Sequence, residues 1–87
     1  MKKFRLEDYE GYFAIHCQTV FEVEIFEEYI NKKFNGNYNL KKRYSCYNEN
    51  TCYRMQDNKR IAYAPVNFCL NHGWQVLEFD DFDWKED

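Results

Sequence analysis

A single amphipathic stretch does most to limit the folds open to this chain. Its apolar residues, Val23, Phe26, Ile30 and Phe34, recur at the spacing of one helix face. A helix with one apolar face needs another layer of structure to cover that face. The segments on either side of it are β-prone, so we expect the covering layer to be a sheet.

Both ends of this helix carry their own signals. Thr19 and Glu22 have the spacing of a capping box, in which each side chain accepts a hydrogen bond from a backbone N–H group. Lys32 and Lys33 complement the helix dipole near its end. Gly36 is predicted to stop the helix by taking a left-handed conformation.

The segments that flank the helix contain three predicted elements. Residues 12–17, YFAIHC, are aromatic and β-prone and predict a buried strand. Residues 35–50 are polar and lack a sustained period, so they predict a loop that leads into a strand. TCYRMQ (51–56) and RIAYAP (60–65) flank a short turn of Asp57, Asn58 and Lys59 and predict a hairpin.

The last segments complete the order of elements. Residues 66–73, VNFCLNHG, predict a short helix after Pro65, and residues 74–79, WQVLEF, predict a final strand. The order is strand, helix, strand, strand, helix, strand, in a single domain of residues 1–87. It indicates an α+β fold with a compact four-stranded, mainly antiparallel sheet and two helices on one face, similar to a ferredoxin-like sandwich.

The composition is typical of a folded protein in the cytoplasm. Apolar residues make up 45% of the 87 residues and aromatic residues 21%, which gives one core enough surface to bury. The basic start reaches acidic residues by Glu7, and no long apolar run follows. We therefore expect neither an export signal nor a membrane span.

The four cysteines, Cys17, Cys46, Cys52 and Cys69, leave three interpretations open. Without an export signal, free thiols packed as small apolar groups are favoured over disulfides. A zinc site is the third interpretation, although Cys46 and Cys52 are separated by five residues, more than the two to four usual for paired ligands.

Charge is segregated along the chain, although the net charge is only −3. Residues 1–31 hold three basic and seven acidic residues, residues 32–60 hold eight and two, and residues 61–87 hold one and six. This layout predicts a basic middle between acidic flanks, unless the three parts neutralise each other in the folded chain.

The acidic end of the chain also carries aromatic residues. Asp80 and Asp81 interrupt the alternation of the last predicted strand, so we expect a bulge or a turn there. Phe82 and Trp84 follow, and two interpretations are open for them. They fold back over the sheet edge as a lid, or they are exposed anchors of an interface.

The sequence contains no strong catalytic pattern. His16 lies beside Cys17, but adjacent residues of a strand point to opposite faces and are poorly placed to exchange a proton. Pairing of Cys17 with His72 stays open as a weak alternative. With three glycines in the chain, a cofactor cradle is not expected. We therefore expect a protein without enzymatic activity, cofactor or metal.

The charge layout favours two binding functions. The first is inhibition of a protein by an acidic, aromatic surface that mimics nucleic acid. Its residues are Glu78, Asp80, Asp81, Phe82, Asp83 and Trp84. The second is binding of a small anionic nucleotide or nucleic acid by the basic, tyrosine-rich middle. Its residues are Lys41, Lys42, Arg43, Tyr44, Tyr53, Arg54 and Arg60. A third interpretation is a structural homo-oligomer whose tyrosines line the subunit contact.

The composition and three segments carry a resemblance. The chain is rich in Asn, Lys, Tyr and Glu, and the segments are YFAIHC before the capped helix, NTCYR (50–54) and GWQVLEFDDF (73–82). Together they resemble small, uncharacterised accessory proteins of phages and mobile elements of low-GC Firmicutes. The resemblance implies a phage-type accessory protein that blocks a host defence, as anti-CRISPR proteins do, either as an acidic mimic of nucleic acid or as a sponge for signalling nucleotides. It carries over no site residue.

Overall fold

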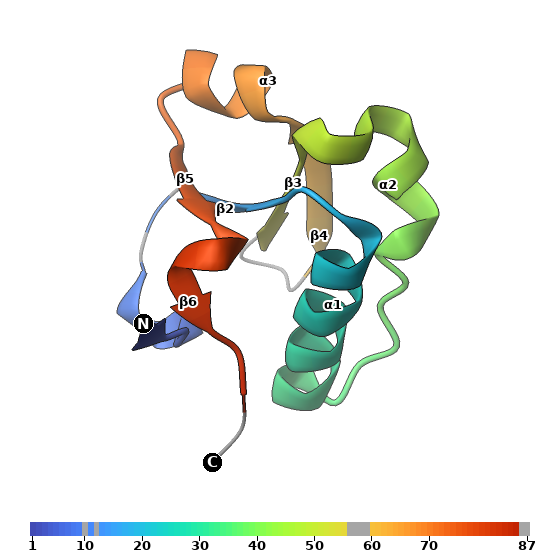
Figure 1. The fold of residues 1–87 in the computed structure, drawn as a ribbon, viewed down its shortest axis with the longest axis vertical. Helices are drawn as coiled ribbons and strands as arrows, with labels where there is room; N and C mark the ends of the chain where they lie inside the picture. Colours follow the sequence, from blue (N-terminus) through green and yellow to red (C-terminus); the bar gives the residue numbers. More distant parts are fainter. Residues whose placement is uncertain (10, 12, 56–59, 86–87) are drawn as a thin grey trace.

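A four-stranded sheet forms the centre of the molecule (Figure 1). The computed structural model describes residues 1–9, 11, 13–55 and 60–85. The strands of the central sheet are β2 (Phe13–Cys17), β3 (Thr51–Met55), β4 (Ile61–Pro65) and β5 (Gln75–Glu78), in the order β4-β3-β2-β5. β3 pairs antiparallel with β2 and with β4, whereas β5 runs parallel to β2.

The helix α1 (Val20–Phe34) covers one face of this sheet. Val23, Phe26 and Ile30 are its buried residues, as the stripe in the sequence predicts. They pack with the residues of β2 that point to the same face, among them Phe13 and Ile15. The largest part of the apolar core therefore lies between α1 and the sheet.

The predicted start of α1 is confirmed, and its predicted stop is off by one residue. The Thr19 hydroxyl accepts a hydrogen bond from the Glu22 N–H at 3.2 Å, and the Glu22 carboxylate accepts one from the Gln18 N–H at 2.8 Å. The left-handed residue at the other end is Asn35, with φ of 50°, rather than Gly36. Asparagine tolerates this conformation better than most residues that have a side chain.

The segment predicted as a loop at residues 35–50 contains a second helix. This helix, α2 (Lys41–Tyr47), is followed by the 3-10 turn η2 (Asn48–Asn50). Leu40 is buried at its start, and Tyr44 packs against the same cluster one turn later. Two such residues among Asn and Lys give too short a stripe to be read as a helix from the sequence.

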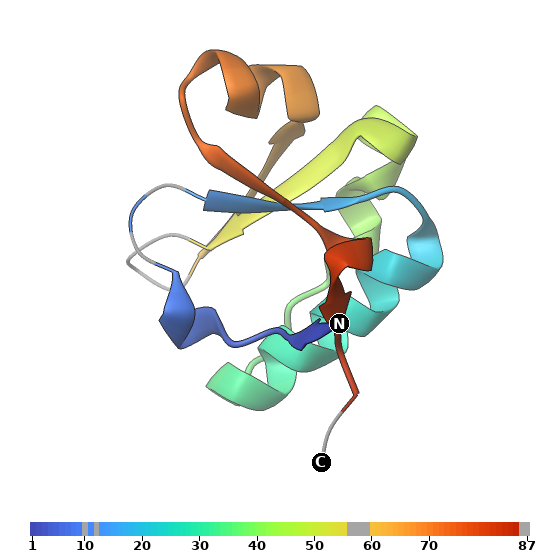
Figure 2. The ribbon, with the colours of Figure 1, turned by 60° about the vertical axis from the view of Figure 1, so that its left-hand side comes forward.

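The short helix α3 (Val66–Asn71) covers the opposite face of the sheet from α1 (Figure 2). Its one buried residue, Cys69, contacts a small cluster that includes Ala14 and Cys52. The prediction of two helices on one face is therefore wrong. The two central strands, β2 and β3, are antiparallel to each other and are the first and second strands of the predicted order along the chain. A ferredoxin-like sheet instead places the first and third strands along the chain side by side. The α+β class is confirmed, and the sheet matches the prediction in part, because it is mixed: β2 with β3 and β3 with β4 are antiparallel, and β2 with β5 is parallel.

The C-terminal segment forms a turn and a short strand. A 3-10 turn, η3 (Phe79–Asp81), lies where Asp80 and Asp81 predict a turn or bulge. The strand β6 (Phe82–Asp83) then pairs in parallel with β1 (Lys2–Lys3), which makes a separate two-stranded sheet. The other 3-10 turn, η1 (Leu6–Asp8), follows β1. The two ends of the described chain thus lie side by side.

Two further predictions concern the hairpin and a membrane span. The hairpin of β3 and β4 is confirmed by their antiparallel pairing, but its turn at Asp57, Asn58 and Lys59 lies outside the described residues. Among the residues that are described, no helix is long and apolar enough to cross a membrane.

Candidate functional site: an aromatic pocket beside helix α3

The face of the sheet under α3 carries small side chains. Register aligns Cys52 with Ala64, and Arg54 with Ala62, across β3 and β4. The helix above them has only six residues, so it covers part of this surface and leaves the rest open. Small side chains under a short cover leave a hollow where larger ones would fill the space.

The hollow is a cavity of about 340 Å³, which we call the aromatic pocket. Its lining comes from α2, β3, β4, α3 and Trp74, the residue just before β5. The lining residues are Tyr47, Cys52, Arg54, Ala62, Tyr63, Ala64, Pro65, Phe68, Cys69 and Trp74. Binding pockets for small molecules are mostly apolar, with a few polar groups, and measure roughly 300 to 1,000 Å³. The aromatic pocket fits this description at the lower end of the size range.

The wall on the α3 side combines a cation with stacked rings. The Arg54 guanidinium lies over the Trp74 indole, with its central carbon 4.7 Å from the ring centroid. Phe68 meets Trp74 edge to face at 5.6 Å and stacks on His72 at 4.0 Å. Phe68 is nevertheless 42% exposed, so part of its ring faces solvent at the rim.

The opposite wall is built by two tyrosines from α2 and β4. The Tyr47 and Tyr63 rings lie 6.0 Å apart between centroids. Arg43, one helical turn before Tyr47, holds its guanidinium 5.4 Å from the Tyr63 ring centroid. Arg54 is thus a lining residue of the pocket, whereas Arg43 contacts one of the lining rings, Tyr63, from outside the pocket.

The floor of the pocket contains two thiols that are poor nucleophiles. Cys52 and Cys69 are buried free thiols and hydrogen-bond to each other. Burial raises the pKa of both groups, so the reactive thiolate is disfavoured. Cys17, on the α1 side of the sheet, has its pKa raised by burial as well. The fourth cysteine, Cys46, is an exposed free thiol on α2.

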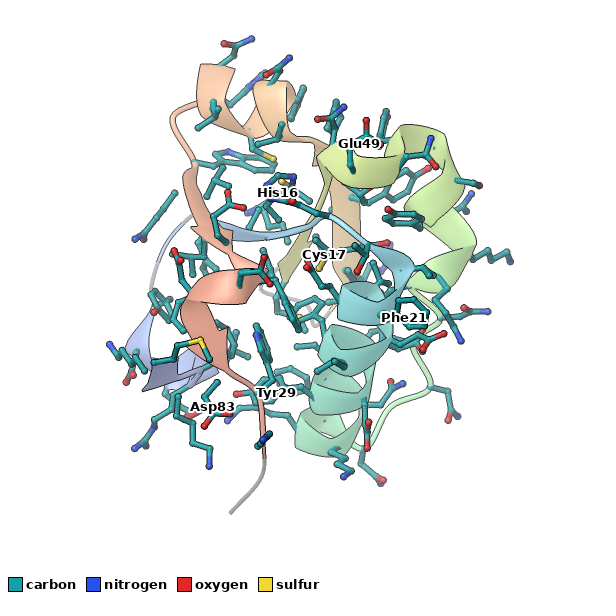
Figure 3. The ribbon with its side chains drawn as sticks, in the orientation of Figure 1. His16, Cys17, Phe21, Tyr29, Glu49 and Asp83 are labelled. Carbon is teal, nitrogen blue, oxygen red and sulfur yellow. The ribbon has the colours of Figure 1, made fainter. Side chains whose placement is uncertain are left out.

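His16 has a structural role behind the pocket. Its Nδ1 lies 2.8 Å from a carboxylate oxygen of Glu78 on β5, and its Nε2 lies 2.7 Å from the backbone carbonyl of Glu49 in η2. Figure 3 shows His16 on β2 next to Glu49. Both neighbours are acceptors, so a ring nitrogen that carries a hydrogen donates it to the neighbour it faces. The imidazole thus ties η2, which follows Tyr47, to the sheet.

The residues predicted as an acidic interface are only partly on the surface. Asp80 and Asp81 are exposed, whereas Asp83 is half-buried and Glu78 is paired with His16. Phe82 is buried in the core. The acidic side chains of this predicted surface therefore do not form one continuous exposed set.

Trp84 is held in the core in place of the exposed position that an interface anchor needs. Its indole lies between Phe4 and Phe79, at centroid distances of 4.5 and 4.8 Å, and its Nε1 donates a hydrogen bond to the Phe79 carbonyl. The prediction that Phe82 and Trp84 are exposed anchors is not supported. Aromatic stacking on the core favours the alternative interpretation, a lid.

The residues predicted as a basic binding surface are divided among several places. Arg54 is in the aromatic pocket, and Lys41 pairs with Glu24 on α1 at 3.5 Å. The Tyr44 hydroxyl donates to the Gln18 carbonyl. Arg60 is exposed just before β4. The remaining three, Lys42, Arg43 and Tyr53, line a neighbouring cavity of about 380 Å³.

Two residues that line the aromatic pocket were not predicted as binding residues from the sequence. Phe68 reads as part of the apolar side of a short helix, and Trp74 reads as the first residue of a core strand. The usable signal was Ala62 and Ala64 on alternate positions of β4, since small side chains on one face of a strand leave room beside it.

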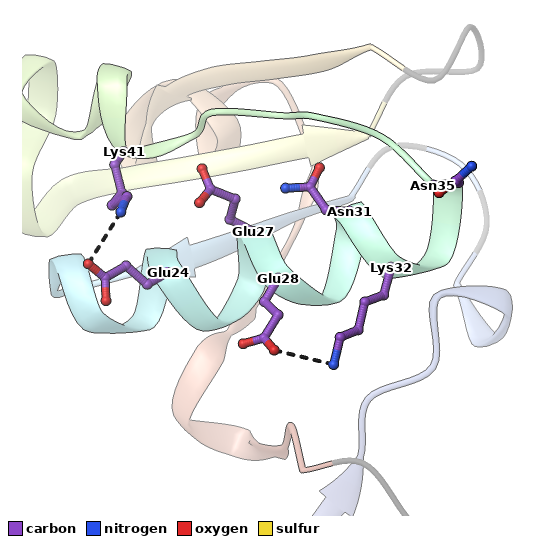
Figure 4. A pocket seen from close by; sticks show the side chains of 7 residues that line it. All are labelled: Glu24, Glu27, Glu28, Asn31, Lys32, Asn35 and Lys41. Carbon is purple, nitrogen blue, oxygen red and sulfur yellow. Dashed lines mark hydrogen bonds and ion pairs between the residues drawn. The ribbon is translucent and has the colours of Figure 1, made fainter.

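A larger groove, beside α1, is less suited to a ligand. It measures about 600 Å³ and lies between α1 and the segment that leads to α2 (Figure 4). Its polar groups already contact one another. Glu24 pairs with Lys41, Glu28 with Lys32, and Asn31 hydrogen-bonds to the backbone of Tyr38. These contacts fix the segment before α2 on α1.

No protein-family model matches this chain, and no similar curated protein or solved structure was found.

Proposed function

We propose that this protein binds a small, planar, anionic molecule of the nucleotide type in the aromatic pocket, without transforming it. The observation that carries the proposal is the Arg54 guanidinium stacked over Trp74 in a cavity with three other aromatic residues. Aromatic rings stack on bases, and arginine attracts phosphate. Stacking contributes about 1 to 3 kcal/mol per base, which is enough to favour a ring-bearing anion over a simple one.

The charge of the whole chain supports a small ligand over a long one. At a net charge of −3 the protein as a whole repels a long polyanion, whereas one or two phosphates interact mainly with nearby arginines. The cytoplasm, where nucleotides are abundant, is the proposed location.

The chemistry of the lining supports binding without catalysis. The ionisable groups of the pocket are one arginine, two tyrosines and two thiols. Burial holds the pKa of both thiols above its usual range, so neither is ready to act as a nucleophile near neutral pH. A general base within reach of a bound ligand is not among them. The protein would therefore act by holding its ligand in stoichiometric amounts.

The proposal is tested by titrating the protein with adenosine 5′-monophosphate and following tryptophan fluorescence. The Trp84→Phe background leaves Trp74 as the reporter, because the chain has two tryptophans. We expect saturable quenching by the mononucleotide, with adenosine and ribose 5-phosphate each binding at least tenfold more weakly. Equal binding of all three compounds, or none, would contradict the proposal.

Matched variants locate the binding. Arg54→Gln and Phe68→Ala should each weaken binding at least tenfold. Arg5→Gln and Phe21→Ala make the same chemical changes away from the pocket, at an arginine beside Glu7 and at a phenylalanine of α1 that is 71% exposed. These two controls should bind like the unmodified protein. A loss of binding in the controls would place the ligand elsewhere.

We propose inhibition of a host nucleic-acid-handling or defence protein as a second candidate function, through the acidic surface near the start of α1. The observation that favours it is the contact of the Glu22 and Asp80 carboxyl groups beside exposed Phe21. Partial burial and then Asp80 raise the pKa of Glu22, and a basic partner would relieve this repulsion. Phe21 would be the apolar anchor in place of Phe82 and Trp84.

This second candidate is tested by pull-down from a Firmicute lysate. The variant carries Asp80→Asn, Asp81→Asn and Phe21→Ala, and Arg54→Gln is its control. Retention of a nucleic-acid-handling protein by the unmodified chain and by Arg54→Gln, but not by the triple variant, would support the inhibitor function. Equal retention by all three forms would exclude this surface.

A further inference from the structure

We propose that the ligand has two linked ring-and-phosphate units, as a linear dinucleotide has, and that its second unit occupies the cavity next to the aromatic pocket. This inference rests on the proposed function. The second cavity, which we call the α2 pocket, measures about 380 Å³ and is lined partly by Tyr38, Lys42, Arg43 and Tyr63. Each cavity alone has the volume of a small-ligand site.

Tyr63 connects the two cavities. Its side chain lines both of them, because β4 is the edge strand of the sheet and one of its neighbours is the helix α2. Tyr63 alternates with Ala62 and Ala64 along β4, so the two cavities open toward opposite faces of the sheet, and a ligand that fills both passes around the edge strand beside Tyr63. The shared ring offers a surface over which a linker between two units can run.

The spacing along α2 gives each cavity its own groups. Arg43 and Tyr47 are four residues apart, so they lie on the same side of the helix, and both contact Tyr63. Tyr47 lines the aromatic pocket, whereas Arg43 and Lys42 line the α2 pocket. The aromatic pocket has Arg54 as its cation. A ring and at least one cation are thus present on each side of Tyr63.

Two linked anionic units suit this arrangement better than one. A mononucleotide placed against Arg54 leaves Arg43 and Lys42 without a phosphate to contact. When a second unit is tethered to the first, its binding becomes intramolecular and adds affinity at little further entropic cost. Both cations of the α2 pocket carry exposed side chains, so solvent-borne phosphate can reach them.

The test compares ligands of increasing length on the full chain. The probes are adenosine 5′-monophosphate, the 5′-phosphorylated dinucleotide pApA and the corresponding hexanucleotide, measured by calorimetry at low salt. We expect pApA to bind at least tenfold more tightly than the mononucleotide. A hexanucleotide that binds like pApA supports a dinucleotide-sized ligand, and one that binds at least tenfold more tightly than pApA overturns it in favour of a longer single strand.

The variants separate failure of this inference from failure of the proposed function. Arg43→Gln should reduce pApA binding to the level of the mononucleotide and leave mononucleotide binding unchanged, whereas Arg54→Gln should weaken both. Because Arg43 is exposed, its variant should melt within a few degrees of the unmodified protein. Equal affinities for the two ligands, or an Arg43→Gln variant that binds pApA normally, overturn the two-unit site alone. Absence of binding by every probe overturns both proposals.

Discussion

The two faces of the central sheet are built in opposite ways. Against α1, a helix of 15 residues, the sheet presents large side chains such as Phe13, Ile15 and Tyr53, and they fill the space. Against α3, a helix of six residues, it presents Ala14 and Cys52, and a cavity stays open beside them. The large apolar contacts are thus concentrated on one face, and the proposed ligand site lies on the other.

The largest effect on stability is expected when a large side chain is removed from the α1 face. Phe26 is fully enclosed there and contacts the rings of Tyr53 and Trp84. Phe26→Ala should lower the free energy of unfolding by about 3 to 5 kcal/mol, measured by chemical denaturation. If that variant does not fold, Phe26→Leu should cost about 1 to 1.5 kcal/mol. A loss below 1 kcal/mol in Phe26→Ala would show that this face does not carry the stability.

The two tryptophans test the difference between the faces separately, because Trp84 packs in the core on the α1 side and Trp74 lines the aromatic pocket on the α3 side. Trp84→Phe removes the hydrogen bond to the Phe79 carbonyl and part of a ring stack, so it should cost about 1 to 2 kcal/mol of stability and leave ligand affinity unchanged. Trp74→Phe should do the reverse, with little loss of stability and at least tenfold weaker binding. Thermal melts measure the stability of both variants, and calorimetric titration with the mononucleotide, which does not depend on Trp74 fluorescence, measures their affinities. If both variants lose stability equally, the two sides do not differ as described.

Filling the cavity should abolish binding at almost no cost to the fold. Ala62 lines the aromatic pocket on the edge strand, so Ala62→Leu places new methyl groups in open space. We expect ligand affinity to fall at least tenfold and the free energy of unfolding to change by less than about 1 kcal/mol. Ser45→Leu, on an exposed position of α2, is the matched control and should bind normally. A large destabilisation by Ala62→Leu would mean that this face is tightly packed.

The smallest expected effect concerns pH at the margin of the α1 face. Partial burial and Asp80 raise the pKa of Glu22 in the folded state, so the folded chain binds its proton more readily than the unfolded chain does. The destabilisation by the charged Glu22 carboxylate is therefore complete above that raised pKa, and the stability of the folded state increases as the pH falls through it. Glu22→Gln should be more stable than the unmodified protein at pH 7, by a few tenths of a kcal/mol, with the difference shrinking toward pH 4. A difference that grows toward pH 4 would contradict this sign.

Local features of the fold were predictable, and the topology was less so. The stripe of Val23, Phe26 and Ile30 and the cap at Thr19 follow from interactions between residues close in the chain. Which face α3 covers depends on small contacts of a single buried residue, Cys69, with strands far away in sequence. No pattern within a short stretch of the sequence indicates which face of the sheet α3 covers. The parallel pairing of β5 with β2 has the same character.

The candidate site was predictable only in its chemistry. The basic, tyrosine-rich middle contains Tyr47 and Arg54, which meet in the aromatic pocket, and Lys42 and Arg43, which line its neighbour. The sequence could not show that Tyr53, in the same stretch, points to the α1 core, because a strand sends adjacent residues to opposite faces and the register decides which. Trp74 reaches Arg54 from a distant part of the chain.

The parallel pairing of β1 with β6 delays the formation of this sheet until the end of the described chain has been synthesised. Lys2 lies opposite Phe82 in that pair, so Lys2 finds its partner only after residue 82 has been added. At about 5 to 20 residues per second, a ribosome needs roughly 4 to 16 seconds to add those 80 residues. Phe4 stacks on Trp84 and waits as long for that contact. Cotranslational folding should therefore begin with α1 and the strands, and the aromatic cluster that joins both ends should close last.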